Sequence, residues 1–164
     1  MLTATLIRRG IARLVLLAAI AACPTLAQAQ TYHSASGNIC QSVYPYSSSG
    51  LGSGLSHEGT GLRNASSSFQ YVFCPLTRTN ALSTSGFSEV YVDVHDGSGT
   101  LWCAVETEDY FGNATNTTGF VTTPNAGAGE IAFYNVPTNA WGTVQLFCTM
   151  PKNSVLNTIN WVEY

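Results

Sequence analysis

The sequence predicts an all-β protein, an antiparallel β-sandwich of jelly-roll type that is held together by two disulfides. Short segments alternate apolar and polar residues with a period of two, which is the pattern of strands with one buried face. Gly and Pro separate these segments at short intervals, and no segment has a convincing helical period. A smaller immunoglobulin-like sandwich is the alternative fold.

The first residues have the pattern of an export signal. Arg8, Arg9 and Arg13 precede a short apolar run at 14–22, and Ala27-Gln28-Ala29 fits a cleavage site. We therefore expect a signal peptide at 1–29 and a single β-sandwich domain at 30–164. The apolar run is too short to span a membrane.

This leader predicts a bacterial protein that is secreted, periplasmic or located at the cell surface. Residues 20–23, Ile-Ala-Ala-Cys, also resemble a lipoprotein box, which would place a lipid anchor on Cys23. Pro24 directly after the cysteine disfavours that alternative.

The charge of the mature chain excludes two classes of partner. Three basic residues and nine acidic residues follow residue 29. Nucleic acids and anionic membrane surfaces require clustered Lys and Arg, so neither is an expected partner. The mature chain also contains no apolar run long enough for a transmembrane segment.

Four cysteines remain after removal of the leader, an even number that predicts two disulfides in an exported chain. The favoured pairs are Cys40–Cys74 and Cys103–Cys148, because Cys103 and Cys148 both lie on the apolar phase of a strand. The sequence alone leaves the other two pairings open. No spacing of cysteine or histidine is typical of a zinc site.

The chain in order begins at 30–43 and continues into a flexible Ser/Gly-rich loop at 44–61. A strand follows at 68–74 and should end before Pro75; Phe69, Tyr71 and Phe73 lie on one of its faces and Val72 and Cys74 on the other. Either face is a candidate for the interior. Residues 110–118 form a polar turn region. Further strands are expected at 119–123, 130–136, 142–150 and 157–164.

Residues 88–109 carry the clearest pattern, which predicts a β-hairpin. Asp96-Gly97-Ser98-Gly99 would form its turn, with Val92 opposite Cys103 on the dry face. Tyr91 and Trp102 would then share the solvent face with Asp93 and Glu106.

Four short segments, at 37–40, 72–78, 90–94 and 102–103, together resemble a loose group of small exported bacterial β-sandwich proteins with disulfides and no assigned function. They read Gly-Asn-Ile-Cys, Val-Phe-Cys-Pro-Leu-Thr-Arg, Val-Tyr-Val-Asp-Val and Trp-Cys. The resemblance covers most of the mature chain and implies the fold and the compartment. It implies no activity and no catalytic residues.

The leading functional hypothesis is a non-enzymatic binding or structural module. Tyr91 and Trp102 beside Asp93 and Glu106 would bind a polysaccharide, because rings stack on apolar sugar surfaces while carboxylates accept hydrogen bonds. An adhesive role is the second form, with another surface protein or self-association through the final strand at 157–164.

Two further hypotheses involve the same carboxylates. Calcium is the candidate cofactor, because hard oxygen donors gather within residues 93–109. The twelve-residue calcium-loop pattern is incomplete in this segment. The donors are Asp93, Asp96, Glu106, Glu108 and Asp109. The alternative function is a secreted hydrolase that uses Asp93 and Glu106. A serine mechanism with Ser98, His95 and Asp93 lacks the nucleophile-elbow motif.

Overall fold

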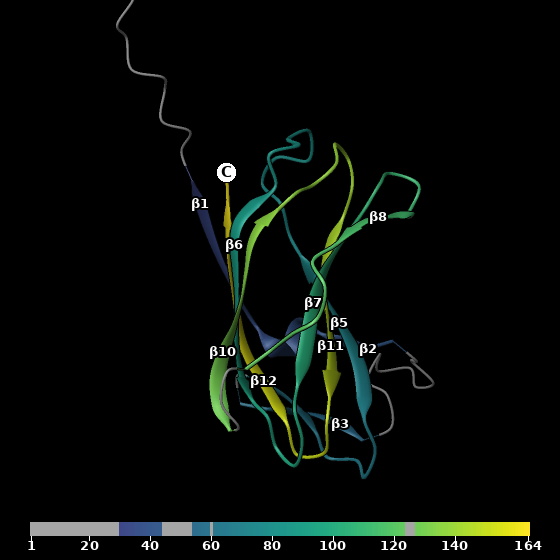
Figure 1. Ribbon diagram of the computed structural model, residues 1–164, viewed down its shortest axis with the longest axis vertical. Helices are drawn as coiled ribbons and strands as arrows, with labels where there is room; N and C mark the ends of the chain where they lie inside the picture. Colours follow the sequence, from purple (N-terminus) through teal and green to yellow (C-terminus); the bar gives the residue numbers. More distant parts are fainter. Residues whose placement is uncertain (1–29, 44–53, 60, 124–126) are drawn as a thin grey trace, which may run out of the picture.

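The computed structural model describes residues 30–43, 54–59, 61–123 and 127–164. The predicted signal peptide, the candidate lipid anchor Cys23 and the centre of the Ser/Gly-rich segment lie outside the described residues. Two antiparallel six-stranded sheets face each other along the long axis of the molecule (Figure 1). This arrangement confirms the predicted all-β sandwich.

Sheet A has the strand order β10-β6-β12-β4-β3, and β1 also pairs with β12. Its strands are β1 (Thr31–Ser36), β3 (Leu55–Glu58), β4 (Gly61–Asn64), β6 (Phe87–His95), β10 (Ala128–Val136) and β12 (Val155–Glu163). A short 3-10 helix, η1 (Gly37–Ile39), follows β1.

Sheet B has the order β2-β5-β11-β7-β8, and β9 also pairs with β7. Its strands are β2 (Gln41–Ser42), β5 (Gln70–Leu76), β7 (Trp102–Glu108), β8 (Ala114–Thr117), β9 (Val121–Thr122) and β11 (Val144–Met150). Within the described ranges, no helix is long and apolar enough to cross a membrane.

Seven strands, from β4 to β7 and from β10 to β12, alternate between the two sheets along the chain. β4, β6, β10 and β12 lie in sheet A, while β5, β7 and β11 lie in sheet B. Each of the connections β4–β5, β5–β6, β6–β7, β10–β11 and β11–β12 therefore crosses from one sheet to the other, as in a jelly roll. The jelly-roll prediction is confirmed.

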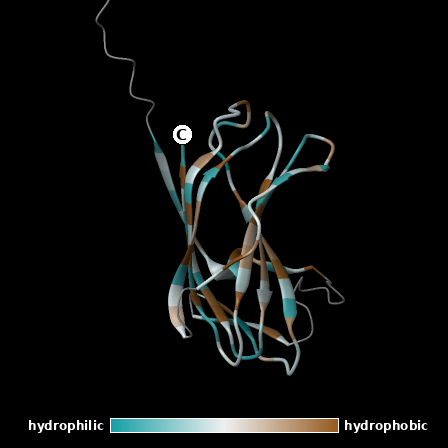
Figure 2. Ribbon diagram, viewed as in Figure 1, coloured by the Kyte–Doolittle hydropathy of each residue, from teal (hydrophilic) through white to brown (hydrophobic). Residues whose placement is uncertain are grey.

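The core fills the space between the sheets. Apolar and polar residues alternate along the strands, as the brown and teal segments of Figure 2 show. In β6, Val90, Val92 and Val94 point inward and are almost fully buried. Opposite them, β7 contributes Cys103 and Val105, which are fully buried.

The predicted β-hairpin at 88–109 is wrong. β6 pairs with β10 and β12, and β7 pairs with β11, β8 and β9, so the two strands belong to different sheets. Residues 96–101 form an arch across the core instead of a tight turn. A hairpin and an arch both bury the Val and Cys faces, and the alternation alone therefore does not distinguish them.

Asp96 stabilises the arch from inside. Its carboxylate is buried and accepts hydrogen bonds from the backbone N–H of Leu101 at 3.2 Å and from Thr123 Oγ1 at 2.7 Å. Gly97 has a φ of +74°, and a Cβ there would lie 2.4 Å from the backbone nitrogen of Ser154. The arch therefore packs against residues 152–154, which a free hairpin turn would not do.

Both favoured disulfides are present, Cys40–Cys74 and Cys103–Cys148. Cys103 and Cys148 are directly opposite each other in the ladder between β7 and β11. Their prediction from the apolar phase of two strands is confirmed.

Three other predictions about the strands need correction. Residues 55–58 of the expected loop form β3, with Leu55 buried, and residues 114–117 of the expected turn region form β8. β5 continues through Pro75 instead of ending before it. Proline has no backbone N–H to donate, and this is tolerated because β2 no longer pairs with β5 at that position. The final strand β12 lies inside sheet A between β6 and the pair β1 and β4, so it is not an edge.

Candidate functional site

The four predicted site residues lie on two opposite outer faces of the sandwich. Tyr91 and Asp93 belong to the outer face of β6 in sheet A, whereas Trp102 and Glu106 belong to the outer face of β7 in sheet B. The single solvent face predicted for them does not exist, because it depended on the β6–β7 hairpin.

This separation also corrects the hydrolase hypothesis. The carboxylates of Asp93 and Glu106 have the hydrophobic core between them. Two carboxylates must flank one glycosidic bond to act as acid and base or nucleophile. Asp93 and Glu106 therefore cannot form a catalytic pair within this chain.

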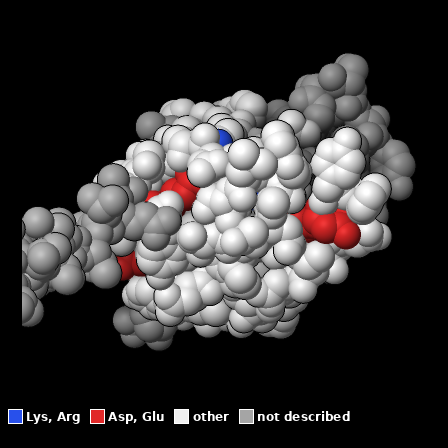
Figure 3. Space-filling view, turned by 90° about the horizontal axis from the view of Figure 1, so that it is seen from above, with Lys and Arg blue, Asp and Glu red and all other residues white. Residues whose placement is uncertain are grey.

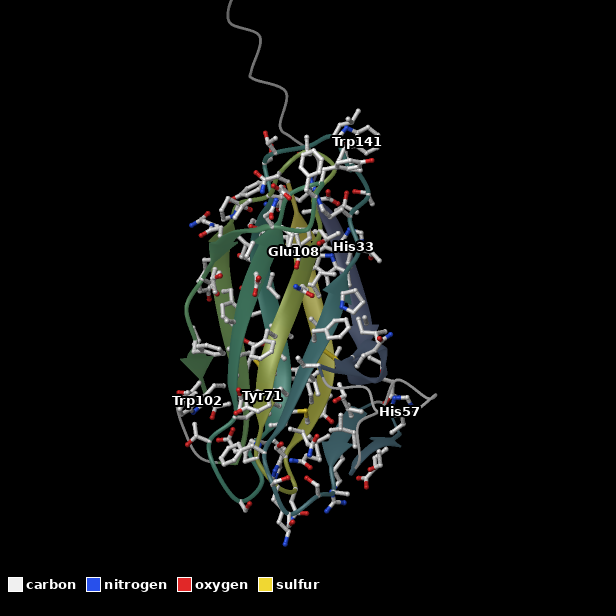
Figure 4. The ribbon with its side chains drawn as sticks, turned by 90° about the vertical axis from the view of Figure 1, so that its right-hand side faces the viewer. His33, His57, Tyr71, Trp102, Glu108 and Trp141 are labelled. Carbon is white, nitrogen blue, oxygen red and sulfur yellow. A yellow bond between two sulfur atoms is a disulfide. The ribbon has the colours of Figure 1, made fainter. Side chains whose placement is uncertain are left out.

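A row of four aromatic side chains crosses the outer face of sheet B, and we call it the aromatic row. The rings of Tyr71 and Phe147 are stacked with centroids 6.2 Å apart. Phe147 meets Phe120 edge-on at 6.0 Å, and Phe120 meets Trp102 edge-on at 6.4 Å. Figure 4 shows Tyr71 and Trp102 on this face.

The register of three neighbouring strands assembles the row. Thr149 of β11 pairs with Tyr71 of β5 on one side and with Trp102 of β7 on the other. One step further along, Phe147 pairs with Phe73 and with Ala104. Because residues two apart point to the same face, these side chains all face outward.

Phe120 joins the row from a connecting segment. Thr118 accepts a hydrogen bond at Oγ1 from Val105 N–H and donates its own N–H to Val105 O, both at 3.0 Å. This pair attaches the segment between β8 and β9 to β7. Ala104 lies on the outer face yet is only 1% exposed, so this small residue lies beneath its larger neighbours.

Three of the four rings of the row are exposed to solvent, and Phe147 between them is partly buried. Tyr71 is 42% exposed, Trp102 48% and Phe120 55%. Aromatic side chains of this size normally lose much of their surface in a folded protein, and a contiguous exposed set marks a contact surface.

Polar groups border the aromatic row on the same face. Glu108 accepts hydrogen bonds from Gln145 Nε2 at 2.9 Å and from Thr143 Oγ1 at 2.8 Å. Glu106 is the ladder partner of Gln145 and Thr117. The face therefore combines ring surfaces with carboxylate, amide and hydroxyl groups (Figure 4).

On sheet A, Tyr91 is part of a different environment. Its ring meets Tyr134 edge-on at 6.2 Å. Desolvation, followed by hydrogen bonding with Tyr134 and Glu89, raises the pKa of Tyr91 to about 12. A hollow of about 370 Å³ lies beside it, bordered by Glu89, His33 and Trp161 among others.

The acidic residues considered as calcium ligands are dispersed. Asp96 lies in the arch, and Glu108 accepts from Gln145 and Thr143. Asp109 accepts from Phe111 N–H at 2.8 Å and from Asn113. Among the residues whose placement is described, no three His, Cys, Asp or Glu side chains lie close enough to hold a metal ion.

The sequence predicts Trp102 as a site residue but does not predict its partners. It does not place Tyr71, because a strand with aromatic residues on one face and Val and Cys on the other has two plausible interiors. Phe147 alternates with the buried Leu146 and Cys148, and this alternation is a signal that could have placed it outward. Phe120 gave no signal, because a connecting segment brings it to the row.

Comparison with solved structures finds the same fold elsewhere. The C-terminal CBM6 of LamC, a marine laminarinase from Zobellia galactanivorans, is 12% identical over 82% of this chain and 100% of its own, with a TM-score of 0.52. The enzymatically active domain of bacteriophage CBA120 tailspike protein 4 is 9% identical over 82% of this chain and 19% of its own, with a TM-score of 0.48.

A low-affinity xylan-binding module, CBM86 from Roseburia intestinalis, is 8% identical over 82% of this chain and 95% of its own, with a TM-score of 0.45. Neither a protein-family model nor a curated protein matches the sequence. Of these three structures, only the LamC module has a TM-score above 0.5. At 12% sequence identity, this likeness shows a shared β-sandwich fold and nothing about function.

Proposed function

We propose that this protein is an exported module that binds polysaccharide along the outer face of sheet B. The observation that carries the proposal is the aromatic row, in which Tyr71, Phe147, Phe120 and Trp102 form a continuous series of ring contacts. Its length across three strands suits an extended chain better than a small molecule.

The physical basis is stacking between aromatic rings and the apolar C–H faces of sugar rings. Rings supply a large apolar surface at little cost in conformational entropy. Glu106 and Gln145 are ladder partners next to the pair of Phe147 and Ala104, where they offer hydrogen-bond partners to sugar hydroxyls. A face with both kinds of group matches the amphipathic surface of a polysaccharide.

Two further observations support the proposal. The disulfides Cys40–Cys74 and Cys103–Cys148 are typical of proteins that leave the reducing cytosol. The fold is shared with the carbohydrate-binding module of LamC, which supports the function by analogy of fold alone.

The test is the variant Trp102→Ala, measured by retention on a panel of insoluble polysaccharides and by calorimetry with soluble ones. The panel comprises cellulose, chitin, xylan, mannan and laminarin. We expect the parent protein to bind at least one member, and the variant to bind it about tenfold more weakly, since lost stacking of one ring is worth about 1–2 kcal/mol.

Tyr134→Ala is the matched control. Tyr134 is 59% exposed on the opposite face of the sandwich and should leave binding unchanged. No retention of the parent on any member of the panel would refute the proposal. Equal losses in both variants would refute the assignment to sheet B, and a stable dimer that Trp102→Ala dissociates would identify the face as a self-association surface.

A further inference from the structure

Trp141 has a backbone conformation that a bulky residue rarely adopts. Its φ is +61°, in the left-handed region. The other two positions with positive φ outside glycine, in the part of the chain that the structure describes, are Asn135 and Asn153. Asn tolerates this region through local hydrogen bonding, whereas Trp does not. Strain of this kind persists where the surrounding structure enforces it, and such sites are often functional.

The surrounding contacts fix the loop that carries Trp141. The backbone N–H of Trp141 donates to Ala81 O at 2.6 Å, which joins loop 137–143 to loop 77–86. A Cβ on Gly142 would lie 2.1 Å from Glu108 O, so the next residue has to be glycine. These contacts fix the backbone at Trp141, while 59% of the residue remains exposed.

The buried Arg78 side chain forms hydrogen bonds with both loops. Its guanidinium donates to Asn139 O at 2.8 Å, to Gly142 O at 3.3 Å and to Ser83 O. The Arg78 side chain is only 5% exposed, and its Nε lies 3.9 Å from Glu163 Oε1 in the core of this end. A buried arginine that connects three loop carbonyls makes this end of the sandwich a preorganised surface.

An open hollow of about 410 Å³ lies at this end between Tyr110 and Trp141. Tyr110 is 72% exposed, and its ring meets Phe111 edge-on at 5.4 Å. Figure 4 shows Trp141 at the extreme end of the molecule, away from Tyr71 and Trp102. This hollow is therefore separate from the aromatic row.

A second, polar hollow of about 200 Å³ borders the same loop. It is lined by Thr107, Thr115, Asn116, Pro137, Thr138 and Asn139, which offer hydroxyl and amide groups and no charge. The carboxylate of Asp109 already accepts hydrogen bonds from Phe111 N–H and from the backbone and side-chain N–H groups of Asn113. Since the guanidinium of Arg78 is buried beneath the loops, the described residues of this end present no free Lys or Arg side chain to an anionic ligand.

We propose that the hollow between Trp141 and Tyr110 is a second ligand site, which binds one neutral sugar residue at the end or on a branch of a glycan. The ligand class rests on the proposed function, whereas the site itself rests on the strained Trp141 and its fixed loop. Two aromatic sides and adjoining uncharged hydroxyl and amide groups match a single neutral sugar ring. With this site, the protein would bind the length of a glycan at the aromatic row and the end or a branch of a glycan at the hollow.

The three tryptophans of the chain allow the two sites to be observed separately. Trp102 reports the aromatic row and Trp141 the hollow at the loop end. Trp161 is an internal reference, because it is 3% exposed and its indole N–H donates to Thr77 O. The experiment is a nuclear magnetic resonance titration of the three indole N–H signals with tetrasaccharides from β-1,4-glucan, β-1,3-glucan, xylan and mannan.

We expect the signals of Trp102 and Trp141 to shift with different saturation curves while Trp161 stays constant. A shift of Trp102 alone would overturn the second site and support the aromatic row. A shift of Trp141 alone would support the second site and overturn the aromatic row, and no shift of either would overturn both. Equal shifts of all three would indicate a global change and overturn the assignment of discrete sites.

Trp141→Gly removes the ring while the positive φ becomes unstrained. Because this variant lacks the Trp141 signal, its second site is followed through the backbone amide signals of Tyr110 and Gly142. The affinity read from those signals should fall at least about tenfold, by loss of one stacked ring, while the Trp102 curve stays unchanged. Leu82→Ala is the control, since Leu82 is 61% exposed in loop 77–86 and lies outside the hollow's lining. Trp141→Gly should also melt at a higher temperature than Trp141→Ala, because alanine is strained at the positive φ and glycine is not. The reverse order would contradict the inference that the surrounding contacts enforce this backbone conformation.

Discussion

At the scale of single residues, Glu163 is a buried carboxylate with several hydrogen-bond donors around it. Its carboxylate is 2% exposed and accepts hydrogen bonds from the N–H of Thr79 at 2.7 Å and from the Thr79 hydroxyl. Burial acts to raise the pKa of Glu163, but the hydrogen bonds from Thr79 and Asn80 and the charge of Arg78 lower it overall. The buried carboxylate is therefore ionised at neutral pH.

The lowered pKa of Glu163 predicts a pH dependence of stability. A group whose pKa is lower in the folded state stabilises the fold above its unfolded pKa of about 4.5, and this contribution is lost as the pH falls through the folded value. We expect the free energy of unfolding to decrease below about pH 4.5. Glu163→Gln should flatten that decrease and, at pH 7, lower stability by about 2–3 kcal/mol because charge-assisted hydrogen bonds are lost.

The measurement is urea unfolding of both proteins between pH 3 and pH 7, followed by tryptophan fluorescence. Asp109→Asn is a useful comparison, because hydrogen bonds with Asn113 also lower the pKa of Asp109 at the surface. Identical pH profiles for the parent and Glu163→Gln would show that Glu163 does not contribute to the acid dependence.

At the scale of strands, the disulfide Cys103–Cys148 lies directly beneath the aromatic row. It connects β7 to β11 at residues adjacent in sequence to Ala104 and Phe147, which face outward. A slip of one residue between these strands would turn the rings toward the core. The disulfide therefore fixes the register on which the outer face depends.

Removal of either disulfide should lower stability substantially. Cys103 and Cys148 are 45 residues apart in sequence, and Cys40 and Cys74 are 34 apart. Closing loops of these lengths stabilises a fold by about 4 kcal/mol in the chain-entropy model. We expect the double variants Cys103→Ala/Cys148→Ala and Cys40→Ala/Cys74→Ala each to lose about that much free energy of unfolding.

Chemical denaturation of the two double variants and the parent provides the check. The first variant should also lose retention on polysaccharide if the register of β7 and β11 slips. A loss of less than about 1 kcal/mol would mean that the strand ladders and the core fix the register without the covalent bond.

At the scale of the whole molecule, the surface offers little positive charge. Arg63 contacts Glu58 at 3.1 Å and Arg78 is buried, which leaves Lys152 among the Lys and Arg residues that the structure describes. Figure 3 shows the loop end as mostly uncharged, with acidic patches and little blue. The described surface therefore offers aromatic and uncharged polar groups for binding, and it has no strongly positive region.

This charge distribution predicts selectivity for neutral polysaccharides. Anionic chains such as alginate and polygalacturonate should not be retained, because the acidic residues repel them and no basic cluster among the described residues compensates. Affinity for a neutral chain should change less than about twofold between 20 and 500 mM salt, since stacking is not screened by ions. Preferential retention on an anionic chain, or a steep salt dependence, would contradict this prediction.

The sequence by itself predicted most of the strands, the inward faces of β6, β7 and β11, and the favoured disulfide pairs, but it left the inner face of 68–74 undecided and did not predict β3 and β8. The alternation in β6, β7 and β11 identified Val90, Cys103 and Cys148 as inward-facing, because burial of one face of a strand depends on local order alone. The same pattern placed Trp102 in solvent, which the structure confirms with an exposure of 48%.

Only the tertiary structure decided which strands share a sheet, and hence which side chains share a surface. Tyr91 and Trp102 are separated by the core, whereas Trp102 lies near Phe120 and Phe147 from distant segments. The sequence also gives no indication of the positive φ of Trp141 or of the burial of Arg78, because contacts between loops that are distant in sequence determine both. The physical reason is that a period of two specifies the two faces of each strand, while pairing between strands depends on non-local packing.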